Sequence, residues 1–152
     1  MLRIVTLFRI VTRWLADAAA GLVVTVLLAE SMLALLTLFG GSEHLLWAVT
    51  QPTAAATPGP ALLAVVWLTA TTAGSMLAAT LSGHLSAALP AGLLPAAAMV
   101  LMAWFFQQPD GMTAMLAFGP LAGCLLGIVA SRTARRRDQA ESAAAPTHGA
   151  EI

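Results

Sequence analysis

Apolar residues form four long segments along the chain, and short polar stretches separate them. The four segments cover about residues 18–39, 60–82, 86–106 and 112–131. A helix needs about 20 apolar residues to cross a hydrocarbon layer of about 30 Å. The pattern therefore predicts an all-α, polytopic membrane protein in which residues 18–131 form a bundle of four transmembrane helices.

The segment before the first span, residues 1–17, places arginine and apolar residues on opposite faces of a helix. This pattern is typical of a basic amphipathic helix that lies in the headgroup layer. One helix over residues 1–39 would be about 58 Å long, so we expect a bend between Asp17 and Gly21. A long tilted helix is the alternative. The apolar run continues to Phe39, which disfavours a cleavable signal peptide.

Small residues recur at every fourth position in three of the predicted spans. In a membrane this spacing lets two helices approach closely, so that dispersion contacts hold them together. The stripes contain Gly21 in the first span, Ala70, Gly74 and Ala78 in the second, and Gly119, Gly123 and Gly127 in the fourth. We expect the fourth span to pack on the second span or on another subunit. The hydroxyls of the second span are expected to bond to backbone carbonyls or neighbouring helices, and a polar conduit lined by them is the alternative.

The connections between the spans carry turn and capping signals. In residues 40–59, Ser42 is expected to cap a short helix. Pro90 and Pro95 lie in or near the first half of the third span, and they predict a kink or a delayed start of that helix.

Charged residues make up 9% of the chain and hydrophobic residues 59%. Soluble domains carry about 25% charged residues, so lipid is the solvent for most of this chain. The basic residues are Arg3, Arg9 and Arg13 near the start and Arg132, Arg135, Arg136 and Arg137 near the end. The positive-inside rule puts both clusters in the cytoplasm, and four spans agree with that parity. We therefore expect a multi-pass protein of the bacterial cytoplasmic (inner) membrane with both termini cytoplasmic.

The tail, residues 132–152, becomes rich in Ala, Ser, Pro and acidic residues after its arginines and shows no periodicity. This composition predicts a disordered cytoplasmic tail. The basic run is short, so it indicates where the last span ends, and we expect no binding to nucleic acid.

Glu30 is the one charged residue inside the four predicted spans. An ionisable group in hydrocarbon costs about 2.5 to 3.5 kcal/mol on insertion scales, so it usually faces the protein interior, water or a partner. We expect its companion to be Thr37, a hydroxyl of the second span or a residue of another chain. Glu30 is therefore a candidate polar contact between helices and a candidate proton site.

Motifs of common enzyme classes are absent from the sequence. It contains no P-loop, no dinucleotide-binding glycine fingerprint, no HExxH, no CxxC and no GxSxG. His44, His84 and His148 are expected at different depths or on different sides, and Cys124 is the single cysteine. We therefore expect no catalytic residue, no metal site and no cofactor.

An acid in the first of four short helices, together with the stretch SEHLLW at residues 42–47, resembles the small multidrug resistance transporters. In that family the first-helix carboxylate binds the cation and the proton alternately, and the resemblance implies this role for Glu30. A broader resemblance is to small uncharacterised four-span bacterial inner-membrane proteins, through Glu30, the stretch Trp67 to Gly83 and the stretch Gly119 to Arg132. The second resemblance implies an architecture and no activity.

These features favour a non-enzymatic integral membrane protein. We expect an accessory or assembly subunit whose small-residue stripes bind helices of a second copy or of a larger complex. Its partners are then the lipid bilayer and other membrane helices. The alternative is a small proton-coupled transporter or channel in which Glu30 carries the proton.

Overall fold

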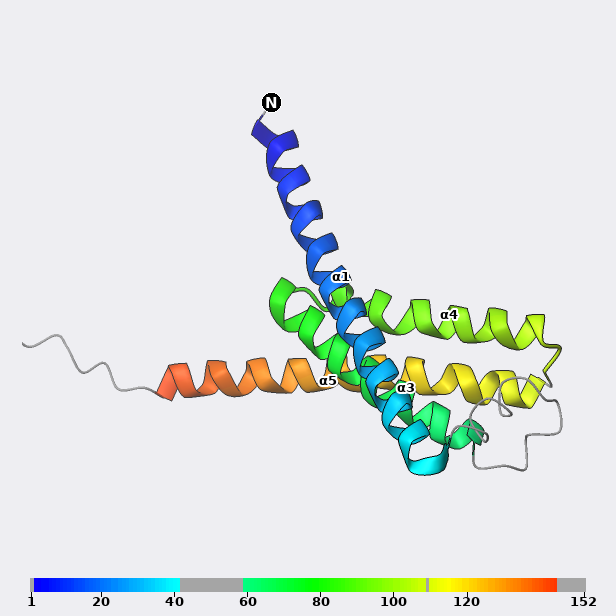
Figure 1. Ribbon diagram of the computed structural model, residues 1–152. Coiled ribbons are helices and arrows are strands. Elements are labelled where there is room, and N and C mark those ends of the chain that lie inside the picture. Colours follow the sequence, from blue (N-terminus) through cyan, green and yellow to red (C-terminus); the bar gives the residue numbers. More distant parts are fainter. Residues whose placement is uncertain (1, 42–58, 109, 145–152) are drawn as a thin grey trace, which may run out of the picture.

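Helices form every regular element in the part of the chain that the structure describes. The structure, a computed structural model, describes residues 2–41, 59–108 and 110–144. The elements are α1 (Leu2–Leu36), the π-helical turn η1 (Thr37–Gly41), α3 (Gly59–Ser82), the 3-10 turn η3 (Leu85–Ala88), α4 (Leu89–Phe105) and α5 (Asp110–Ala144) (Figure 1). Four helices are long and apolar enough to cross a membrane. The chain is thus an all-α, multi-pass membrane protein, as the sequence predicts.

The first helix differs from the expectation of a bend between Asp17 and Gly21. α1 is one uninterrupted helix of 35 residues, the long helix that the sequence leaves as the alternative. Residues 18–20 are alanines, the strongest helix formers, so no local signal stops the helix there. Its first turns extend beyond the other helices (Figure 1). The headgroup-layer position of residues 1–17 stays a prediction.

The last helix corrects the prediction of disorder over residues 132–152. α5 continues through the arginine cluster to Ala144, and this part projects past the rest of the bundle (Figure 1). Between Arg132 and Ala144 the chain contains neither Gly nor Pro and is rich in Ala and Arg, which favour helix. Residues 145–152 lie outside the described residues, as does the short helix expected after Ser42.

Contacts between small residues show that α1 and α3 are antiparallel. Gly21, early in the apolar part of α1, lies against Ala78 near the end of α3. Eight residues further along α1, Ala29 packs with Ala70, which is earlier in α3. The start of α1 therefore lies at the same end of the bundle as the end of α3.

The fourth predicted span, α5, runs parallel to α3. Gly119 contacts Ala64, and Gly127 contacts Thr72, so both helices advance together. α5 therefore leaves the bundle at the end where α3 ends and where α1 enters it. We call this the arginine end of the bundle, because the arginines of α1 and α5 lie toward it.

The helix that lies between α3 and α5 in the sequence, α4, runs antiparallel to both of them. Gly92 near its start lies against Cys124, whereas Met99 packs with Met112 at the start of α5. α4 begins late, as the prolines predict: η3 precedes it, Pro90 is in its first turn, and Pro95 is buried inside it.

The buried side chains differ in size between the two ends of the bundle. Away from the arginine end it is made of bulky side chains, namely Leu63, Met99, Met112 and Leu116. Toward the arginine end the buried cluster consists of Ala18, Ala78 and Ala87, with Trp14 packed against it. The helices α1 and α3 are therefore held together by small residues near the arginine end.

Candidate functional site

The small residues of α1 and α3 meet in a close seam. A Cβ added at Gly21 would lie 2.6 Å from the Cβ of Ala78 and 2.6 Å from the carbonyl oxygen of Gly74. Such distances leave no space for a side chain, so the backbones touch directly. The seam continues at Ala29, which is 1% exposed and packs with Ala70.

A second seam joins α5 to the other side of α3. A Cβ added at Gly119 would overlap the backbone of Ala64, and one added at Gly123 would overlap Thr71 Oγ1. At Gly127 the added Cβ would lie 2.6 Å from the carbonyl oxygen of Thr72. Of the two partners that the sequence leaves open for this stripe, the structure brings the second span into contact with it.

The hydroxyls of α3 are largely used within the protein. Thr69, Thr71, Thr72 and Thr80 donate to backbone carbonyls three or four residues earlier in their own helix. Ser75 instead donates across to the carbonyl oxygen of Ala88, at 3.3 Å. These bonds match the expected return of hydrogen bonds to the backbone, and they occupy the donors that a polar conduit would need.

Glu30 lies on the outer face of α1. Its neighbour Ala29 is 1% exposed and packs with Val66 and Ala70 in the middle of α3, whereas Glu30 is exposed. No hydrogen bond to Glu30 is found among the described residues. Thr37 donates to the carbonyl oxygen of Ala34 at 2.7 Å, so the structure does not bring Glu30 and Thr37 together. The carboxyl group therefore lies level with the middle of α3 and faces away from its own bundle.

α1 is also the least covered of the four helices. In the most apolar 18-residue stretch of α1, 11% of the residues are buried inside the protein, compared with 44% in the corresponding stretch of α3. Leu27, one turn before Glu30, is 61% exposed, and Val23 is 54% exposed. The outer face of α1, which we define as Val23, Leu27 and Glu30, is thus apolar with one carboxyl group.

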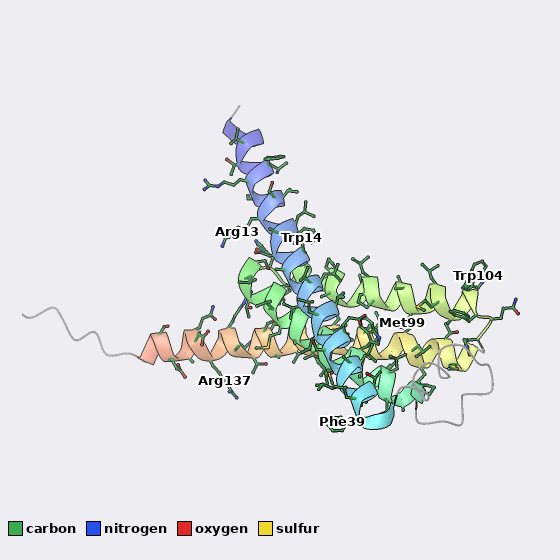
Figure 2. All side chains as sticks on the ribbon, viewed as in Figure 1. Arg13, Trp14, Phe39, Met99, Trp104 and Arg137 are labelled. Carbon is green, nitrogen blue, oxygen red and sulfur yellow. The ribbon has the colours of Figure 1, made fainter. Side chains whose placement is uncertain are left out.

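One arginine of the chain makes hydrogen bonds to another helix, and several others are exposed on the surface. Arg135 donates from Nη1 to the carbonyl oxygen of Gly83 at 2.6 Å, and from Nη2 to that of Ala79. The exposed arginines are Arg9, Arg13, Arg132, Arg136 and Arg137, and Figure 2 shows Arg137 on the projecting part of α5. Arg3 lies in the first turn of α1.

Two polar residues to which the sequence gives no role lie on one cavity. Asp17 and His84 line a space of about 210 Å³ together with Ile10, Arg13, Trp14 and Ser82. Figure 2 shows Arg13 and Trp14 where α1 passes the end of α3. The sequence carries a partial signal for this convergence. Two predicted spans separate the start of the first helix from the turn after the second, so both are expected on the same side of the membrane.

The described residues hold no group of three or more His, Cys, Asp or Glu side chains that could bind a metal ion. Cys124 is buried as a free thiol and donates to the carbonyl oxygen of Ala88 at 3.5 Å. No protein-family model, no curated protein and no solved structure matches this chain.

Proposed function

We propose that this chain is a non-enzymatic subunit of a membrane complex and binds another membrane subunit through the outer face of α1. The observation that carries the proposal is the position of Glu30, an exposed carboxyl group that lies level with the middle of α3 on a helix that its own bundle leaves largely uncovered. In this proposal the membrane is the bacterial cytoplasmic membrane, and the arginine end faces the cytoplasm.

The energetic argument concerns the carboxyl group in lipid. An acid held in hydrocarbon costs about 2.5 to 3.5 kcal/mol on insertion scales. Inside this chain nothing among the described residues offsets that cost for Glu30. A partner helix that covers the carboxyl group and hydrogen-bonds to it would remove much of the penalty, and this gain favours association.

The chemistry of the face defines the partner. Val23 and Leu27 are exposed and apolar, so they fit the side of a membrane helix. Opposite Glu30 the partner helix carries a hydroxyl, an amide or a basic side chain, because a carboxyl group needs a hydrogen-bond donor or a positive charge beside it. The occupant is thus a helix of another membrane subunit with one polar residue at matching depth.

Proton-coupled transport through Glu30, the alternative function, requires a water-filled route to the carboxyl group. None of the three cavities described is lined by Glu30, and two of them are lined only by apolar residues. The outer-face contact therefore has the stronger support.

Purification in mild detergent from the native membrane tests the proposal. The substitution Leu27→Trp enlarges a side chain on the outer face, and Leu125→Trp is its matched control, because Leu27 is 61% exposed and Leu125 64% exposed on α5. We expect a partner subunit to copurify with the wild type and with Leu125→Trp, and to be lost with Leu27→Trp.

The substitution Glu30→Leu tests the hydrogen bond to the partner separately from the shape of the outer face. It keeps the outer face apolar and removes the hydrogen bond, so we expect it to weaken association while the folded chain remains stable. A wild-type chain that purifies alone as a monomer would overturn the proposal. A chain that associates only with a second copy of itself would overturn the assignment of another subunit.

A further inference from the structure

The cavity at the arginine end has the dimensions and lining of a small polar ligand site. Its volume is about 210 Å³, well above the roughly 10 to 15 Å³ that a single water molecule needs. Its walls come from α1 on one side and from the end of α3 with the following turn on the other. It is therefore larger than a single ion needs, and it lies between two helices that the Gly21–Ala78 contact holds in place.

One carboxylate oxygen beside this cavity has no hydrogen-bond partner among the described residues. Asp17 Oδ2 is shielded from solvent and accepts no hydrogen bond from them. A buried carboxylate oxygen normally accepts at least one hydrogen bond. A cationic donor beside the Asp17 carboxylate would stabilise it best, because hydrogen bonds between ionised partners are the strong ones.

The same cavity also offers groups for an anion. Arg13 and His84 line it together with Asp17, and no ion pair within 4 Å joins these three side chains among the described residues. Arginine recognises phosphate through several N–H donors at once. The cavity thus presents a site for a positive group and a site for a negative group side by side.

The walls of the cavity are held in place. Trp14 Nε1 donates to Ser86 Oγ at 3.1 Å, which ties α1 to the turn before α4. Ser82 Oγ donates to the carbonyl oxygen of His84 at 2.8 Å and accepts from its backbone N–H at 2.9 Å. A tryptophan at the end of an apolar span is typical of the headgroup layer, so lipid headgroups are the ligands nearest to this cavity.

We propose that the cavity binds the zwitterionic headgroup of a phosphoethanolamine lipid, with Arg13 and His84 on the phosphate and Asp17 on the ammonium group. The ammonium group is the counter-charge for the Asp17 carboxylate, and the phosphate is the partner of Arg13. This site does not depend on the outer face of α1 or on the partner proposed for it.

Native mass spectrometry of the delipidated protein in detergent tests this site. The probes are three lipids with identical acyl chains, carrying phosphoethanolamine, phosphocholine or phosphoglycerol headgroups, and soluble phosphoethanolamine without chains. We expect phosphoethanolamine lipid to bind roughly tenfold more tightly than either other lipid, because phosphocholine has no N–H donor and phosphoglycerol has no cation. Equal binding of the three lipids by the wild type would overturn the proposal.

Charge substitutions assign the roles of the residues. Asp17→Asn should abolish the preference for phosphoethanolamine over phosphocholine, and Asp138→Asn on the exposed part of α5 should keep it. Arg13→Gln should weaken all three lipids roughly tenfold, whereas Arg137→Gln should change none. An Asp17→Asn protein that keeps the full preference would overturn the role of Asp17.

The soluble phosphoethanolamine probe shows whether the ligand is a membrane lipid or a soluble molecule. Soluble phosphoethanolamine that binds as tightly as the lipid would overturn the assignment to a membrane headgroup. If Asp17→Asn fails to fold, the comparison of three lipids on the wild type and on Arg13→Gln still decides the proposal.

Discussion

The guanidinium group of Arg135 on α5 donates a hydrogen bond to the backbone carbonyl oxygen of Gly83, with an Nη1 to O distance of 2.6 Å. Gly83 has a φ of 74°, the left-handed conformation that ends many helices. The last carbonyl groups of a helix have no partner within it and carry the negative end of its dipole. Arg135 therefore closes the end of α3 and fastens it to α5.

Arg135→Gln should lower the stability of the folded protein. Hydrogen bonds from a charged donor contribute about 1.5 to 3 kcal/mol, and Arg135 is half-buried, so we expect a loss of about that size in the free energy of unfolding. Arg137→Gln is the control because Arg137 is exposed on the same helix, and its effect should stay within about 0.5 kcal/mol. Thermal or denaturant unfolding in detergent measures both, and equal losses would contradict the cap.

Gly123→Ala and Gly111→Ala should change stability in opposite directions. A Cβ at Gly123 would overlap Thr71 Oγ1 and the carbonyl oxygen of Leu68, and overpacking typically costs about 1 to 3 kcal/mol. A Cβ at Gly111, in the same helix, would meet nothing within 4 Å. There alanine favours the helix by up to about 1 kcal/mol. Unfolding curves of the two variants in one detergent decide the sign, and a stabilising Gly123→Ala would contradict the seam between α3 and α5.

Cys124 should resist thiol reagents in the folded protein. Its side chain is 4% exposed and donates to the carbonyl oxygen of Ala88, so a maleimide reaches it only when the helices separate. Labelling should slow by roughly tenfold for each 1.4 kcal/mol of the opening free energy. Ser142→Cys in a Cys124→Ala background is the control and should react at once, because Ser142 is exposed. Equal rates at the two positions would contradict the burial of Cys124.

The small-residue pattern predicts which positions pack, but it does not assign their partners. On α3, Gly74 belongs to the stripe that also contains Ala70 and Ala78, whereas Thr71 belongs to an adjacent row with Ser75 and Ala79, which is also made of small residues. The structure turns the first toward Gly21 of α1 and the second toward Gly123 of α5. Either assignment fits the spacing, so only the three-dimensional packing of all four helices distinguishes them.

The orientation of Glu30 follows from the same competition. The sequence places Glu30 about 100° around the helix from Ala29, and it allows either residue to face the bundle. Because the small side chain of Ala29 permits close approach to α3, Ala29 packs against α3, and Glu30 therefore faces outward. The meeting of Asp17 and His84 is likewise a product of tertiary packing, since no local pattern links a residue of α1 to one in the turn after α3.

The last prediction concerns the sidedness of the bundle. α1 and α3 are antiparallel and α5 is parallel to α3, so His84 and Ser142 belong to the arginine end, and Gln107 joins α4 to α5 at the opposite end. In a Cys124→Ala background, a membrane-impermeant maleimide applied to sealed vesicles should label His84→Cys and Ser142→Cys from one side only.

The third position supplies the contrast that makes this test decisive. Gln107→Cys should be labelled only from the other side, and vesicles of inverted orientation should exchange the two patterns. From the positive-inside rule we expect the side of His84 and Ser142 to be the cytoplasmic one. If His84→Cys and Gln107→Cys react from the same side, α4 does not cross the membrane, and the four-span arrangement fails. If all three react from both sides of intact vesicles, the bundle does not span the bilayer in the described packing, because closed helices exclude the reagent from the opposite face.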